Sequence, residues 1–366
     1  MNTTKLHYTI ALSLLDGIGP RIAKTLVSQY GEAEAFFNEK KLTNTSIPGF
    51  SKKRLKELNK TKALLKADEQ VNFILKKGIK TYYFKHDNYP HRLKNCIDAP
   101  IILYAKGGFT MNPNRVIAVV GTRQVTNYGK ELINQLIMEL KPYGIQVVSG
   151  LAYGVDVFTH KACLKEGVET VGVLGHGLDR LYPSQHQNVA SRMVSTNGGL
   201  LTEFITGTNP DRENFPKRNR IVAGMTDATV VIESGSKGGS LITANLANDY
   251  SRDVFAFPGN ITSEFSAGCN SLIANNKAHL ITGAQDIVNM LGWNHQLKTT
   301  IQTQLFHDLA PDEKEVVALL KTENEMSIDL LSAKLKKPVS KLSSMLLGLE
   351  IQGIVAARPG SKFKLC

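Results

Sequence analysis

The 366-residue sequence predicts an α/β protein with a Rossmann-like, doubly wound and mostly parallel sheet. A small N-terminal helical domain of the helix-hairpin-helix kind and a C-terminal winged helix are expected to flank this sheet. Three observations predict this fold: apolar runs alternate with helical segments in mid-chain, glycine breaks interrupt the first segment, and three helical patterns precede a terminal hairpin. The length exceeds one ordinary core, so we expect three domains, residues 1–65, 66–295 and 306–366.

Six short apolar runs predict the strands of the sheet. They do not alternate between apolar and polar residues, as expected for strands buried on both faces of a parallel sheet. Most end in glycine or another small residue, and helical segments such as KELINQLIMEL lie between them. The runs are VIAVVG (116–121), IQVVSG (145–150), TVGVLG (170–175), LLTEF (200–204), ATVVIES (228–234) and DVFAFPG (253–259).

The first 65 residues have a helical pattern with two short breaks, DGIGP at 16–20 and SIPGF at 46–50. A glycine turn between two helices lets backbone N–H groups approach a phosphate. Three cations follow the second break, and we expect them to make secondary DNA contacts: Lys52, Lys53 and Arg54. A small helical bundle used for protein contacts is the alternative interpretation.

The C-terminal segment has helical patterns near 312–320, 328–336 and 339–352. The following residues, IVAARPGSKFKL, predict a two-stranded hairpin with its turn at PGS, which completes a winged helix. The third helix is expected to bury Val339, Leu342, Met345, Leu346 and Leu349 and to expose only Lys341 and serines. A helix with so little charge predicts weak duplex recognition, and contact with a protein is an equally supported role.

The chain carries 44 Lys and Arg against 32 Asp and Glu, a net charge of +12. Residues 1–90 hold 16 basic and 8 acidic residues, which is +8 of that excess. A basic excess suits nucleic acid, an anionic surface or simple solubility. The early apolar run YTIALSLL is too short to span a bilayer and lacks a cleavage site, so we expect a cytoplasmic protein without membrane insertion. Four scattered cysteines without a C-x-x-C pair are typical of reduced thiols.

The segment NFPKRNR at 214–220 concentrates cations beside an aromatic ring. Loops that follow the strands of a doubly wound sheet meet at one edge, where ligands bind, and this segment belongs to one of them. Cations neutralise phosphates, and Phe215 offers an unpaired base a flat face worth about 1–3 kcal/mol. Because a duplex covers its base faces, the combination favours single strands. Alternatively, Phe215 is a core residue and the cations cap a helix.

Enzymatic functions have little support in the motifs. The sequence lacks a P-loop, a G-x-G-x-x-G fingerprint after the first strand, metal-ligand spacing and a nucleophile elbow, so we expect no catalytic residues, cofactor or metal. The competing hypothesis is a nucleotide-processing Rossmann enzyme. GSKGGSLITA at 235–244 resembles the phosphate loop P-G-G-x-G-T-x-x-E of nucleotide phosphoribohydrolases, but no carboxylate follows Ser240 before Asp249. A phosphate cradle without hydrolysis is therefore expected.

Several motifs in order along the chain resemble the DNA processing protein A family, also called Smf. They are VGTRQVTNYG, SGLAYGVDVFTHKACLKEG, GVLGHGLDRLYPSQHQN, FPKRNRIVAG, GGSLITANLA and VFAFPGN, spread over about residues 88–283. The resemblance implies a homodimer that binds and protects incoming single-stranded DNA. It also implies that the protein loads the RecA recombinase onto this DNA during natural transformation.

The resemblance and the loop positions together nominate the DNA contacts. We expect these to be Gly121, Thr122, Arg123, Gly150, Arg212, Phe215, Lys217, Arg218, Asn219, Arg220, Gly239 and Ser240. Two positions depart from the family pattern: KGGS replaces the commoner SGS, and Tyr153 stands where members with GLARGID carry arginine. The second change removes one cation and offers a ring for stacking.

Overall fold

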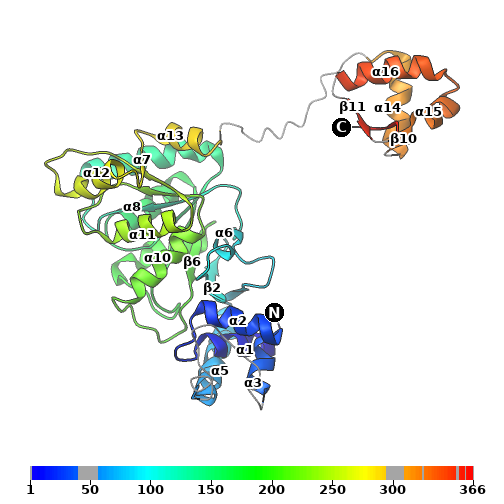
Figure 1. Ribbon diagram of the computed structural model, residues 1–366. Coiled ribbons are helices and arrows are strands. Elements are labelled where there is room, and N and C mark those ends of the chain that lie inside the picture. Colours follow the sequence, from blue (N-terminus) through cyan, green and yellow to red (C-terminus); the bar gives the residue numbers. More distant parts are fainter. Residues whose placement is uncertain are drawn as a thin grey trace. The chain divides into compact units, whose positions relative to one another are not determined.

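The computed structural model describes residues 2–39, 57–293, 309–323, 325–351, 354–358 and 360–365. It divides into two compact units, Met1–Asn294 and His295–Cys366 (Figure 1). The second predicted glycine break and the cations Lys52, Lys53 and Arg54 lie outside the described residues.

The N-terminal helices are α1 (Thr3–Ser13), α2 (Pro20–Tyr30), α3 (Ala33–Asn38) and α5 (Lys60–Lys77). The first predicted break forms the turn between α1 and α2, where Gly17 has a φ of 78° and Pro20 begins α2. These helices pack around Leu26 and Phe36 and onto Tyr104 of the sheet. The boundary expected between residues 65 and 66 lies within α5, which runs from Lys60 to Lys77. This whole helix belongs with the N-terminal helices, because it packs against α1 and shares its apolar core.

The described residues of the first unit form a nine-stranded sheet in the order β1-β2-β6-β5-β4-β3-β7-β8-β9. All strands from β6 to β9 in this order are parallel, whereas β1 and β2 are antiparallel additions at one edge. The strands are β1 (Lys80–Tyr83), β2 (Ile102–Gly107), β3 (Val116–Val120), β4 (Gln146–Ser149), β5 (Glu169–Val173), β6 (Gly199–Thr202), β7 (Ala228–Val231), β8 (Asp253–Ala256) and β9 (His279–Leu280).

All six predicted runs are strands, β3 to β8, which confirms the mostly parallel, doubly wound sheet. The prediction missed β1, β2 and β9 at the two edges. Most side chains of β1 are only partly buried, and both residues of β9 are exposed. Neither strand is therefore a continuous apolar run that the sequence would reveal. Their pairing partners, distant in sequence, complete these strands.

Helices cover both faces of the sheet. Side chains alternate across each strand, so Ile117 and Val119 of β3 join one core while Ala118 and Val120 join the other. On the first face lie α7 (Asn127–Leu140), α8 (Val155–Glu166), α9 (Gln187–Ser195) and α13 (Ala284–Met290). On the second lie α6 (His91–Lys94), α10 (Asn214–Gly224), α11 (Gly239–Asp249) and α12 (Ala267–Ala274). Single 3₁₀ turns occupy Lys141–Tyr143, Ser184–His186 and Glu264–Ser266.

The second unit is a winged helix, as predicted. It contains α14 (Pro311–Glu323), β10 (Met326–Ser327), α15 (Ile328–Leu335), α16 (Val339–Ile351), β11 (Val355–Arg358) and β12 (Lys362–Leu365). The sheet order is β10-β12-β11, so the short β10 adds a strand to the expected hairpin. Leu342, Leu346 and Leu349 are buried as expected, but Val339 is 41% exposed because it begins α16. Lys341 is paired with Asp312.

Candidate functional site

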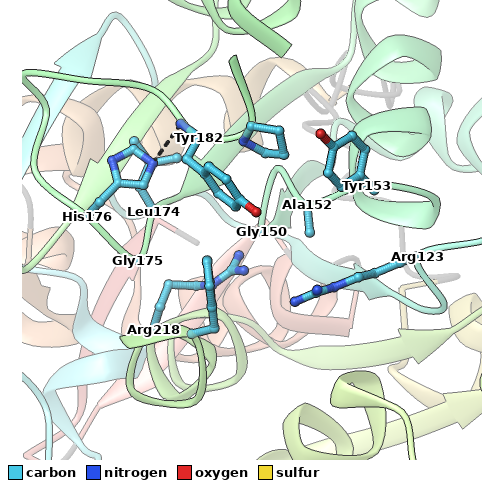
Figure 2. Close-up of a pocket in the computed structure, with 11 residues that line it drawn as sticks. Arg123, Gly150, Ala152, Tyr153, Leu174, Gly175, His176, Tyr182 and Arg218 are labelled. Atoms are coloured by element: carbon cyan, nitrogen blue, oxygen red, sulfur yellow. Dashed lines mark hydrogen bonds between the residues drawn. The ribbon is translucent and has the colours of Figure 1, made fainter. Parts of the chain in front are cut away.

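A pocket lies where the loops after β3, β4 and β5 meet the first turns of α10 (Figure 2). This is the carboxyl edge of the parallel strands, where ligands of doubly wound proteins bind. We call it the arginine–aromatic pocket. Its lining residues are Arg123, Gly150, Ala152, Tyr153, Leu174, Gly175, His176, Tyr182, Pro183, Phe215 and Arg218.

Arg218 supplies a buried positive charge to the pocket. Its side chain is 5% exposed, and one guanidinium nitrogen donates to the carbonyl of Val173 at 3.0 Å. A Cβ atom at residue 150 would overlap this guanidinium, so the observed position of Arg218 requires glycine there. Gly150 was expected to let a ligand approach its backbone, and here its missing side chain makes room for Arg218.

The charge of Arg218 is incompletely balanced. Burial lowers the pKa of its guanidinium, an effect that the carboxylate of Asp156 opposes and the like charge of Arg123 reinforces. Burial also raises the pKa of Asp156, which Arg218 opposes. Among the described residues, Arg218 Nε has no hydrogen-bond partner and Arg218 has no ion pair within 4.0 Å. Unbalanced buried charge is unfavourable, so an anion in this pocket would be stabilised.

Phe215 lies on the first turn of α10 as a half-buried wall of the pocket. The guanidinium carbon of Arg123 is 5.9 Å from the centre of its ring, and the ring of Tyr182 is 6.1 Å away at a 39° tilt. Pro216, next in the chain, is tolerated because the first turn of a helix needs no N–H from it. Because it is only half-buried, Phe215 is not one of the fully buried core residues.

His176 organises the loop after β5 and is a structural residue of the pocket. Its Nδ1 lies 2.9 Å from the carbonyl of Gly177, and its Nε2 accepts from the backbone N–H of Tyr182 at 3.1 Å. Burial lowers the pKa of His176, which favours the neutral imidazole whose Nε2 can accept this bond. The arrangement fixes the backbone of Tyr182 at the pocket.

Arg220 does not join the pocket, although the sequence prediction included it. Its guanidinium is bonded to the Glu203 carboxylate and to the Asp98 carbonyl, and both charged side chains are largely buried. A guanidinium occupied in this way has few donors left for a phosphate. The physical reason is helix geometry. Side chains two positions apart in a helix point in directions about 200° apart around the helix axis, so Arg218 and Arg220 face different sides.

Four predicted phosphate contacts lie at the junction of β3 and β7 and do not line the pocket. Gly121 is packed against Val155, and the Thr122 backbone donates to the Glu233 carbonyl. The Ser240 hydroxyl is buried and bonded to the Ser234 hydroxyl at 2.8 Å, whereas Gly239 faces open space. The interactions of Gly121, Thr122 and Ser240 are therefore internal.

The other predicted contacts of this segment do not line the pocket, but they neighbour Phe215 and Arg218 in the chain. Arg212 precedes α10 and Lys217 lies in its first turn, and both are exposed. Asn219 is partly exposed on α10. The prediction of site residues missed Tyr182 and Pro183, which line the pocket. Both belong to the glycine-rich loop GHGLDRLYP, and its position after a predicted strand could have identified them.

The described residues contain no group of three or more His, Cys, Asp or Glu side chains arranged to hold a metal ion. Within the same part of the chain, no helix has both the length and the apolar character needed to cross a bilayer.

The fold and the pocket define a Rossmann-like protein with a cationic, aromatic ligand site and two accessory helical modules. Comparison with protein-family models gives the family: residues 80–292 match the model described as DNA recombination-mediator protein A. The chain belongs to this family. Residues 303–361 match the DprA winged helix domain, and residues 10–58 match a SAM-like helix-hairpin-helix tandem.

Individual relatives agree with this assignment. The chain is 32% identical to Protein Smf of Escherichia coli over 76% of this chain and 75% of that protein. It is 28% identical to Protein Smf of Synechocystis over the full length of both. Among solved structures, DNA processing protein A from Streptococcus pneumoniae covers 79% of this chain with 98% of its own, at 30% identity and a TM-score of 0.62.

A second solved structure bears on ligand binding. It is the structure of DNA processing protein A from Helicobacter pylori, which concerns the single-stranded DNA binding mode of that protein. The match has a TM-score of 0.52 at 28% identity and covers 60% of this chain and 97% of the other.

Proposed function

We propose that this protein binds single-stranded DNA in the arginine–aromatic pocket and acts as a recombination mediator. The observation that carries the proposal is the presence of two arginines and a half-buried aromatic wall in one pocket at the carboxyl edge of the sheet. In this proposal Arg123 neutralises a phosphate and Phe215, whose ring centre is 5.9 Å from the Arg123 guanidinium carbon, stacks on a base. Membership of the recombination-mediator family supports the same role.

In this proposal, Arg218 has a different role from that of the exposed cations. Because it is buried and fixed by the Val173 carbonyl, it contributes a permanent positive field at the pocket floor. Arg123, Arg212 and Lys217 are exposed and supply charge that attracts the DNA backbone from solution. The predicted contacts Lys52, Lys53 and Arg54 would add further salt-sensitive attraction. None of these groups is proposed to perform a chemical step.

The binding proposal is tested by anisotropy titration of a labelled oligonucleotide against the same sequence as a duplex. We expect clear preference for the single strand, because only unpaired bases offer a face to Phe215. Equal affinity for both forms would contradict the site. Incubation with nucleoside monophosphates tests the enzymatic alternative, and release of free base that is lost in Arg123→Gln would overturn our choice.

We further propose that the protein is a homodimer and loads RecA onto single-stranded DNA during natural transformation. The proposal is supported by the family membership and by the family resemblance of the sequence. Two pockets in a dimer would hold one strand at two points and strengthen binding to longer oligonucleotides. Light scattering that shows a monomer at micromolar concentration, with and without DNA, would exclude the dimer.

The loading step has its own test. RecA hydrolyses ATP when it assembles on DNA, so the lag before hydrolysis on strands coated with single-strand binding protein reports assembly. We expect this protein to shorten the lag and Phe215→Ala to restore it. An unchanged lag, with single-strand binding intact, would reject loading but leave the binding proposal in place.

A further inference from the structure

Tyr153 exposes an aromatic ring on the wall of the arginine–aromatic pocket. It follows β4, and its side chain is 40% exposed; Tyr182, 46% exposed, lines the same pocket. Large apolar rings are seldom left in water, and a cluster of them marks a surface that a ligand covers. We propose that Tyr153 stacks on an unpaired nucleobase beside the base held by Phe215 and Tyr182, an inference that rests on the proposed single-strand binding.

The ring of Tyr153 is held in place before any ligand arrives. Its hydroxyl donates to Gln185 Oε1 at 2.9 Å, and its ring meets that of His186 at 5.0 Å and 72°, edge to face. His186 is in turn fixed by a 2.9 Å bond between its Nδ1 and the Leu151 carbonyl. A side chain anchored at both its ring and its hydroxyl loses little conformational entropy on binding, which favours affinity.

The pocket separates the two parts of a nucleotide. Figure 2 shows the rings of Tyr153 and Tyr182 on one side, with Arg123 and Arg218 on the other. A nucleotide has a flat apolar base and an anionic phosphate, so it fits a pocket that offers both aromatic rings and arginines. Tyr153 contacts the neutral Gln185 and brings no charge of its own. Its contribution should therefore be insensitive to salt.

The test compares oligothymidylate with an abasic oligonucleotide of the same length, which keeps the phosphates and lacks the bases. Tyr153→Ala is expected to weaken oligothymidylate binding about 5- to 150-fold. Its salt dependence should not change, and binding of the abasic strand should not change either. An oligonucleotide with one 2-aminopurine gives a second readout, because stacking on Tyr153 quenches the fluorescence of that base and Tyr153→Ala should relieve the quenching.

Two matched variants complete the experiment. Tyr153→Phe keeps the ring and loses only the bond to Gln185, so it should bind nearly as the parent does. Tyr153→Arg replaces the ring by a cation and should steepen the log–log salt slope by about 0.7. Equal losses on thymidylate and abasic strands, or no loss in folded Tyr153→Ala, would reject stacking. Failure of the parent protein to bind any single strand would instead reject the proposed function.

Discussion

A Cβ atom at residue 150 would overlap the guanidinium group of Arg218, so the floor of the arginine–aromatic pocket depends on a glycine after β4. The same guanidinium is buried and held by the Val173 carbonyl at the end of β5. Two neighbouring strands and α10 thus set the position of one charge. The charge faces the space where we place the DNA.

Gly150→Ala should therefore displace Arg218 and weaken single-strand binding by at least about tenfold, with a loss of stability of about 1–3 kcal/mol from overpacking. Gly348→Ala in α16 is the control, because a Cβ there meets no atom within 4 Å and this residue is not among the expected DNA contacts. It should bind normally and melt at the same temperature or slightly higher. Anisotropy titration and thermal melting of both variants check the prediction; normal binding by Gly150→Ala would show that Arg218 is dispensable.

Arg123 and Phe215 should differ in their response to salt. Arg123→Gln removes an exposed cation, so the log–log slope of affinity against salt should fall by about 0.7 on a single strand. Phe215→Ala should reduce affinity about 5- to 150-fold with the slope nearly unchanged, since stacking releases few counterions. Titrations over a range of salt concentrations measure both. Circular dichroism must show that each variant is folded, and identical slopes for Arg123→Gln and the parent would remove Arg123 from the site.

Arg220→Ala should affect stability first. It leaves Glu203 buried without its partner, and breaking a buried pair costs about 3–5 kcal/mol. The salt slope of DNA binding should stay at the parent value, unlike that of Arg123→Gln. Adding Glu203→Gln should recover part of the melting temperature, because the uncompensated charge is then gone. A lower salt slope in folded Arg220→Ala would return this residue to the DNA interface.

His160 should make the protein less stable in acid. It is fully buried, with Nδ1 2.7 Å from the Thr170 hydroxyl and no partner for Nε2 among the described residues. Burial, with the nearby charges of Arg218 and His186, lowers the pKa of His160 to about 3. Between that value and about 6.5 the unfolded chain binds a proton that the folded chain does not, so stability is full above pH 6.5 and falls as pH decreases.

Urea unfolding of the parent and of His160→Gln at several pH values measures this effect. The variant has no titrating group at the site, so its stability should vary less between pH 7 and pH 4. The free energy of unfolding of His160→Gln is expected to be lower than that of the parent at every pH. The prediction concerns only how much each free energy changes with pH. Parallel pH profiles for the two proteins would show that His160 does not control acid stability.

A chain that ends at Asn294 should retain single-strand binding. All lining residues of the arginine–aromatic pocket belong to the first unit, and each unit has its own apolar core. In the described part of the winged helix, Lys334, Lys337, Lys341 and Lys362 are each paired with a carboxylate, which reduces their attraction for phosphates. A large loss of affinity in the folded truncated protein would assign DNA contacts to the second unit.

The sequence by itself determined the parallel strands and the edge of the sheet at which the candidate pocket lies. Buried parallel strands are continuous apolar runs, so β3 to β8 are visible locally, and their following loops must meet at one edge. The same patterns predicted the glycine turn between α1 and α2 and the three helices of the winged helix. The loop positions and the family resemblance together nominated Arg123, Gly150, Phe215 and Arg218, and these four residues do line one pocket.

Only the tertiary structure decided which neighbouring side chains share that pocket. Arg218 and Arg220 are alike in sequence, but one lines the pocket and the other is paired with Glu203 from the loop after β6. Tyr153 and Tyr182 come from different loops and line the same pocket only because β4 and β5 are adjacent. Local patterns record burial and periodicity along one segment, whereas a side chain's partner is set by strand order and helix rotation, which bring distant segments together.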